Sequence, residues 1–218
     1  MSTLSELREL VEQDLDDAGN AVWTAGEIDR AIERALSGYS RARPQEAVGT
    51  ITLAADGREV SLSTLTGLTR VVRVWYPYTS TAPEDPPEWR QWELWGATLY
   101  VLDGGEPASG DVVRVYYQKP QTIEDLNSAT ETTVPAEHEE VVVGGAGGYA
   151  AMEKARGSVG EAGVSTETPE HWLEWATGRL DSFNVQLTEI RRQLLLRVDK
   201  RVPIQRPGWD RDSVRDGI

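Results

Sequence analysis

The sequence contains no cysteine and only two histidines among 218 residues. The absence of cysteine excludes disulfide scaffolds, thiolate zinc sites and cysteine nucleophiles. Imidazole chemistry has two possible positions, His138 and His171. No apolar run approaches the roughly 18 residues that span a bilayer, and the N-terminus lacks the apolar core of a signal peptide. We therefore expect a soluble protein that is made in the cytoplasm and has no membrane partner.

Basic residues are also few. Asp and Glu number 36 against 22 Lys and Arg, so the formal charge is −14. Such a surface repels phosphate backbones, which argues against general nucleic-acid binding. The charge is uneven, because residues 190–218 carry +4 and the preceding 189 residues carry −18. This asymmetry indicates a partner. A solvating tail is the alternative, but Val202, Ile204 and Trp209 are apolar anchors that such a segment rarely has.

Two helices are expected at the N-terminus. Apolar residues recur at helical spacing over residues 4–16, and Thr3 with Glu6 forms a capping box at the start of that pattern. Thr24 and Glu27 form a second capping box before another amphipathic stretch. The short connection between the two stretches predicts an antiparallel helix pair.

The period of the apolar pattern then changes to that of β-strands. Asp56-Gly57 is a strong hairpin signal between the first two runs. Six short strands without an intervening helix predict an antiparallel sheet or a small sandwich. The expected strands cover residues 48–54, 58–62, 68–76, 89–95, 98–102 and 112–118.

Helical periodicity returns after residue 135. One helix is expected over 136–156, and a longer one begins at Thr168, whose hydroxyl suits an N-cap. The second helix can run about 30 residues, or about 45 Å, which exceeds what so small a domain covers. We expect its distal end to be exposed or clasped by another chain.

The predicted fold class is therefore α+β. It combines a helical bundle body, with two N-terminal and two C-terminal helices, an inserted antiparallel β-sheet or small sandwich, and an extended C-terminal tail rich in proline. The expected divisions are 1–45 for the first half of the helical body, 46–122 for the β insert, 123–200 for the second half of the body, and 201–218 for the tail.

Two motifs suggest enzyme chemistry but lack its context. Gly145-x-Gly147-x-x-Ala150 approaches a dinucleotide fingerprint, yet only three valines precede it and no second parallel strand follows. We interpret these glycines as positions where a neighbouring helix approaches closely. Residues 137–140 (Glu-His-Glu-Glu) lack the spacing of a zinc motif. The helix macrodipole by itself favours acidic residues in the first turn, so these acids do not require a metal to explain them. We predict no catalytic residues, cofactor or metal.

Tryptophan is abundant, with eight residues in the chain. Four of them, Trp75, Trp89, Trp92 and Trp95, fall within 21 residues. In one strand over 89–95, Trp89 and Trp95 would share a face and Trp92 would lie on the other. At least one indole is therefore expected to face a loop, another subunit or a ligand. Protein–protein contact is the preferred interpretation, and a carbohydrate- or surface-binding module built on this insert is the alternative.

The order of these segments resembles the head–tail adaptor proteins of tailed bacteriophages, the neck components that form a ring under the portal. The resemblance covers about residues 4–185. Its carriers are LSELRELVEQDLDD from Leu4, WTAGEIDRAIERAL from Trp23, LTGLTRVVRVWYP from Leu65, the pair of segments from Pro87 to Trp95, VRVYYQKP from Val113, and PAEHEEVVVGGAGGYA from Pro135. The glycine pairs 144–145 and 147–148 depart from the alanine-richer sequence expected of this family.

The resemblance implies a structural virion protein in the neck, at the head–tail interface. It implies a ring of neighbouring adaptor subunits, typically twelvefold, that contacts the portal protein and the next neck or tail component, while genomic DNA passes through the lumen without specific binding. The predicted portal-docking residues are Arg191, Arg192, Arg197, Arg201, Val202, Ile204, Arg206 and Trp209. The predicted residues facing the neck, the tail or another subunit are Trp89, Trp92 and Trp95.

Overall fold

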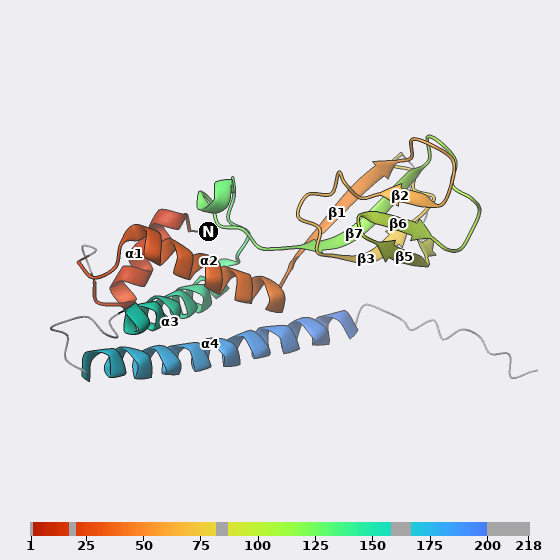
Figure 1. Cartoon of the computed structure of the whole chain (residues 1–218). Coiled ribbons are helices and arrows are strands. Elements are labelled where there is room, and N and C mark those ends of the chain that lie inside the picture. The colour runs from red at the N-terminus through yellow and green to blue at the C-terminus, as the bar shows by residue number, and fades with distance from the viewer. Residues whose placement is uncertain (1, 18–20, 82–86, 158–166, 200–218) are drawn as a thin grey trace, which may run out of the picture.

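The computed structural model describes residues 2–17, 21–81, 87–157 and 167–199. Four helices pack together, and two antiparallel sheets are inserted between the second and third helix (Figure 1). This arrangement confirms the predicted α+β class. The helices are α1 (Leu4–Asp14), α2 (Ala25–Ala42), α3 (Glu139–Gly157) and α4 (Glu167–Asp199), with 3₁₀ turns at Leu126–Ser128 (η1) and Ala136–His138 (η2).

Both predicted capping boxes are present. The Thr3 backbone N–H donates to Glu6 Oε2 at 2.8 Å, and the Thr24 backbone N–H donates to Glu27 Oε2 at 2.8 Å. In each case the threonine hydroxyl accepts from the backbone N–H of the glutamate. Each reciprocal pair satisfies two backbone donors that the helix itself leaves free, so the local sequence determines where α1 and α2 begin.

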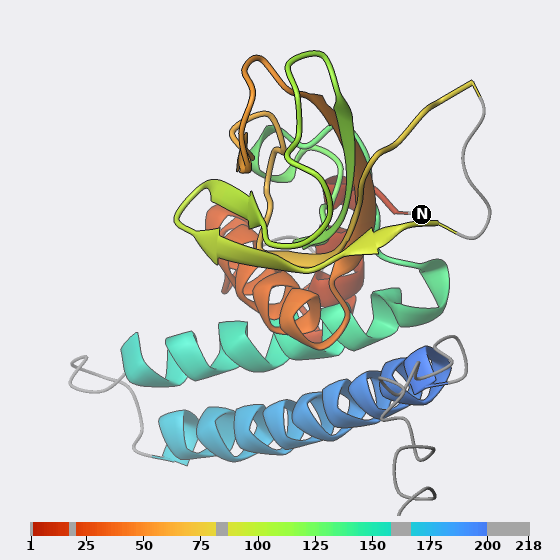
Figure 2. The same ribbon diagram turned by 90° about the vertical axis from the view of Figure 1, so that its right-hand side faces the viewer.

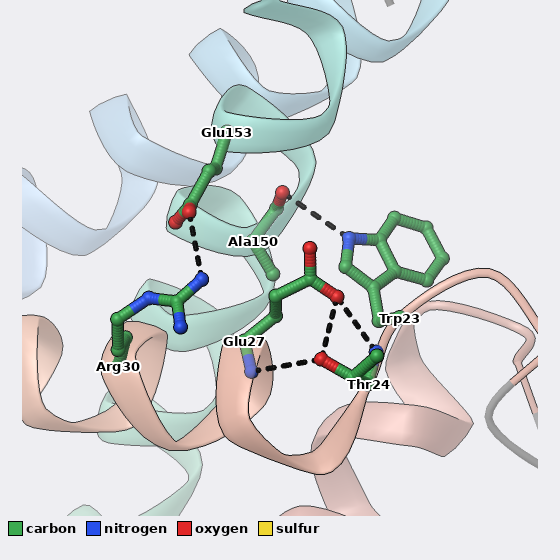
Figure 3. Close-up of polar contacts among 6 residues, drawn as sticks. All are labelled: Trp23, Thr24, Glu27, Arg30, Ala150 and Glu153. Carbon is green, nitrogen blue, oxygen red and sulfur yellow. Dashed lines mark hydrogen bonds and ion pairs between the residues drawn. The ribbon is translucent and has the colours of Figure 1, made fainter. Parts of the chain in front are cut away.

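Close contacts tie α2 to α3, as Figure 3 shows. Trp23, immediately before α2, is 2% exposed, and its indole Nε1–H donates to the carbonyl of Ala150 on α3 at 3.2 Å. About two turns further along the chain, Arg30 of α2 forms a 3.0 Å ion pair with Glu153 of α3. The indole bond is buried and fixes the entry of α2, whereas the exposed ion pair adds little to stability.

Helix α3 lies between α2 and α4 in the stack (Figure 2). Its glycines make this possible, as predicted. A Cβ on Gly145 would lie 2.8 Å from ring atoms of Phe183 on α4, and a Cβ on Gly148 would lie 3.0 Å from Leu180. A Cβ on Gly147 would lie 2.7 Å from Asp14 Oδ2, which follows from the close approach of α1. The segment that resembled a dinucleotide fingerprint is thus the middle of a helix whose small residues let two neighbours approach.

The described part of the β insert forms seven strands in two sheets. The strands are β1 (Gln45–Thr52), β2 (Glu59–Ser61), β3 (Arg70–Trp75), β4 (Trp89–Arg90), β5 (Trp92–Trp95), β6 (Thr98–Val101) and β7 (Val112–Lys119). The larger sheet has the order β1-β7-β3-β4 and the smaller one β2-β6-β5, all antiparallel. Fully buried side chains from both sheets, including Val60, Val74, Leu99 and Val115, form one core.

Two expectations for the strands were wrong. Asp56-Gly57 does not close a hairpin, because β1 pairs with β7 and β2 pairs with β6. The expected strand 89–95 is divided at Gln91 into β4 and β5, which belong to different sheets. The reason is the same in both places. The chain crosses from one sheet to the other, so that each layer contributes apolar side chains to the shared core, and a turn signal does not specify the strand partner.

Helix α4 has 33 residues, or about 50 Å at 1.5 Å per residue. It begins at Glu167, one residue before the predicted N-cap. Its buried side chains, Ala176, Phe183 and Ile190, face the bundle, whereas Leu195 and Leu196 near its distal end are 61% and 56% exposed. The exposed distal end was predicted. No helix within the described residues has both the length and the apolar composition needed to cross a membrane.

Candidate docking surfaces

The first candidate surface is the distal end of α4. Arg191 and Arg192 are exposed there. The Arg192 guanidinium binds both carboxylate oxygens of Glu189, at 2.9 and 3.1 Å. Hydrogen bonds from Arg192 and then Gln193 lower the pKa of the Glu189 carboxyl below its usual range. Arg191 has no ion pair within the described residues, so it offers a free positive charge at this end of the helix.

Apolar groups adjoin these arginines. The exposed Leu195 and Leu196 follow them by one turn. On the other side, Arg191 borders a cleft of about 290 Å³ between α2, α3 and α4, which Arg41, Phe183 and Leu187 also line. Charged donors beside apolar area are typical of the contact residues of protein interfaces. This end of α4 therefore has the composition of a protein-binding surface.

Of the predicted portal-docking residues, the structure places Arg191 and Arg192 on this surface. Arg197 lies in the last turns of α4. The rest of the predicted set lies outside the described residues, namely Arg201, Val202, Ile204, Arg206 and Trp209.

The three predicted contact tryptophans of the β insert do not gather in one place. Trp89 is 42% exposed on β4, and Trp95 is 68% exposed on β5. Trp92 is half-buried and packs against the core shared by the sheets. The two exposed indoles lie on strands of different sheets.

A second surface emerges from the pairing of β3, β4 and β7, and we call it the aromatic–arginine face. Its members are Arg73, Trp75, Tyr78, Trp89, Arg114 and Tyr116. Register places Arg73 beside Tyr116, and Trp75 between Trp89 and Arg114. The sequence signal was the alternation of arginine and aromatic residues at 73 and 75 and again at 114 and 116. Sequence reasoning missed it because the two pairs lie about 40 residues apart.

Stacking organises this face. The Arg73 guanidinium lies 5.0 Å from the Trp89 ring centroid, and that ring lies edge-on to Tyr116 at 5.4 Å. Arg114 lies 4.7 Å from the Tyr78 ring and donates to its hydroxyl at 2.6 Å. Within the described residues neither arginine has a carboxylate partner. These two arginines therefore lie on an aromatic surface where no described carboxylate compensates their charge.

Residues 137–140, considered as a metal motif, serve helix packing instead. The Tyr39 hydroxyl and His138 Nδ1 are 2.7 Å apart, and Glu139 accepts from the backbone N–H of Ser2 at 2.8 Å. Burial raises the pKa of Tyr39 to about 12. His171 is exposed on α4. Across the described part of the chain, no three His, Asp or Glu side chains gather in a group that could hold a metal ion.

Exposed arginine, leucine and tryptophan side chains have the composition of a surface that contacts other proteins. The sequence profile of the family described as SU10 adaptor protein matches residues 2–193, nearly the whole chain. The chain belongs to this family, a family of phage head–tail adaptors, which confirms the resemblance. The family is a structural adaptor family and not a known enzyme family. No curated protein matches the chain.

Proposed function

We propose that this protein docks as a ring under the portal of a phage head, extends the DNA channel and offers a platform to tail or neck components. Family membership implies a virion adaptor role, and the observation that carries the finer proposal is the distal end of α4. Arg191, Leu195 and Leu196 lie exposed there beyond the helical core. An apolar helix end that no described residue covers is typical of an interface.

The sequence beyond α4 supports portal docking. Residues 201–218 follow directly from this exposed end and combine arginines with Val202, Ile204 and Trp209. Apolar anchors provide most of the binding free energy of an interface, and the arginines provide orientation and rate. The acidic body, at −18 over residues 1–189, suits a lumen wall that DNA passes without adhering. A twelvefold ring is the stoichiometry that the family resemblance suggests.

The test is a truncation. Deleting residues 198–218 removes only the last two described residues of α4, so the circular dichroism spectrum and the unfolding midpoint should change little. Co-sedimentation with portal-bearing heads should be lost. A full-length chain with Val202, Ile204 and Trp209 replaced by serine should lose it as well, because the anchors are removed while the charge is kept. Undiminished co-sedimentation of both variants would reject portal docking by this segment.

A further inference from the structure

The aromatic–arginine face is built to receive carboxylates. A guanidinium stacked on an aromatic ring can form bidentate bonds to acids through its edge N–H groups, and Arg73 lies over the Trp89 ring in this way. Arg114 donates one N–H to the Tyr78 hydroxyl and adds its positive charge beside it.

The same face also offers apolar area. Val48 on β1, Val72 at the β-bulge of β3 and Trp89 on β4 are 48%, 44% and 42% exposed. Positive charge is thus interleaved with exposed apolar side chains across neighbouring strands. A complementary surface must present acids interleaved with apolar side chains over a similar length.

Helix α4 carries such a surface on the side that faces away from the bundle. We call it the acidic stripe: Glu170, Leu173, Glu174, Asp181 and Val185, at helical spacing on one side of the helix. All five are exposed, with Leu173 at 46% and Val185 at 69%. None of the three acids has an ion pair within the described residues. The stripe therefore matches the face in charge and in apolar content.

The fold keeps the two surfaces apart within one chain. Figure 1 shows the sheets at one end of the molecule and the first half of α4 at the other. A contact between face and stripe therefore requires two copies. Because the two surfaces differ, the contact is heterologous, and a heterologous contact that closes generates a ring.

We propose that the aromatic–arginine face of one copy binds the acidic stripe of α4 on the neighbouring copy. This inference rests on the proposed ring, and it names the surfaces that build the ring. Arg73 and Arg114 pair with the acids of the stripe, and Trp89 and Val72 cover its apolar side chains.

A charge exchange tests the pairing. The face variant is Arg73→Glu with Arg114→Glu, and the stripe variant is Glu174→Arg with Asp181→Arg. Each variant alone puts like charges together, so copy–copy association should fall by at least about tenfold. An equal mixture of the two variants, or one chain carrying all four substitutions, restores opposite charges and should recover association. Arg156→Glu, an exposed charge reversal at the end of α3, is the control and should have no effect.

Association is measured by disulfide trapping, since the chain has no cysteine of its own. Val72→Cys on the face is mixed at high concentration with Leu173→Cys or Val185→Cys on the stripe, without heads and then with portal-bearing heads. Cross-linked dimers that disappear with each charge variant and return in the exchanged pair support the inference. If heads bind the wild-type chain but no cross-link forms, or if charge reversal affects only binding to another virion component, the inference is overturned. Cross-links without binding to heads would overturn the portal proposal alone.

Discussion

The ring of Phe183 on α4 fills the space that a side chain on Gly145 of α3 would occupy. A Cβ at that position would lie 2.8 Å from two ring atoms. The same ring lies 3.3 Å from the Cβ position of Gly38 on α2, and the side chain is 2% exposed. One phenylalanine therefore joins three helices, and it does so because two of them lack a side chain at the contact.

Gly145→Ala should destabilise the protein by about 1–3 kcal/mol, because the added methyl group forces the buried ring to move. This loss exceeds the gain of up to about 1 kcal/mol that alanine brings in helix propensity. Gly144→Ala is the matched control. A Cβ at position 144 would meet no atom within 4 Å. Only the higher helix propensity of alanine then acts, and the free energy of unfolding should rise by about 0.5–1 kcal/mol. Urea denaturation measures both, and equal shifts in the two variants would contradict the packing argument.

Asp17 should be essential for the entry into α2. Its carboxylate is 5% exposed and accepts from the backbone N–H groups of Ala21 at 2.9 Å, Val22 at 3.1 Å and Trp23 at 2.9 Å. Asp17→Ala removes all these acceptors and should cost about 2–4 kcal/mol in the free energy of unfolding. Asp17→Asn keeps one carbonyl oxygen and should cost clearly less in the same denaturation assay. Equal costs for the two variants would show that the bonds to the carboxylate contribute little.

Tyr76 should make the β insert sensitive to alkali. Its hydroxyl donates to Asp111 Oδ2 at 2.6 Å. Burial first, and then this bond, raise the pKa of Tyr76 from 10.0 to about 12. A raised pKa contributes stability that is complete below pH 10 and is lost as the pH rises through about 12. Tyr76→Phe should therefore lose less unfolding free energy between pH 10 and 12 than the wild type. An unchanged slope over that interval would argue against this contribution.

The same pair acts in the opposite direction in acid. The hydrogen bond from Tyr76, and then that from the Ala108 N–H, lower the pKa of Asp111 below 3.8. A lowered carboxyl pKa contributes stability that is present above the usual pKa and lost as the pH falls through the folded value. The same variant, Tyr76→Phe, therefore also tests the acid side. Its unfolding free energy should fall less steeply below about pH 4 than that of the wild type.

The sequence alone was sufficient to predict the four helices and the α+β class of the fold. Both capping boxes, the apolar stripes of α1 and α2, and the close approach at Gly145 and Gly148 were predicted from residues a few positions apart. Helical hydrogen bonds and helical faces join residues three or four apart, so the information that specifies them is local. The uneven charge of the chain was also evident from the order of its residues.

Strand partners and the aromatic–arginine face were decided only by the tertiary structure. Asp56-Gly57 predicted a hairpin, but β1 pairs with β7, which lies some 60 residues further along the chain. Arg73 and Arg114 share one face because β3 lies beside β7. A strand can pair with any edge whose register buries its apolar face, so the choice depends on how both sheets fill one core. No local pattern encodes that choice, because the free energy that makes it comes from contacts between distant segments.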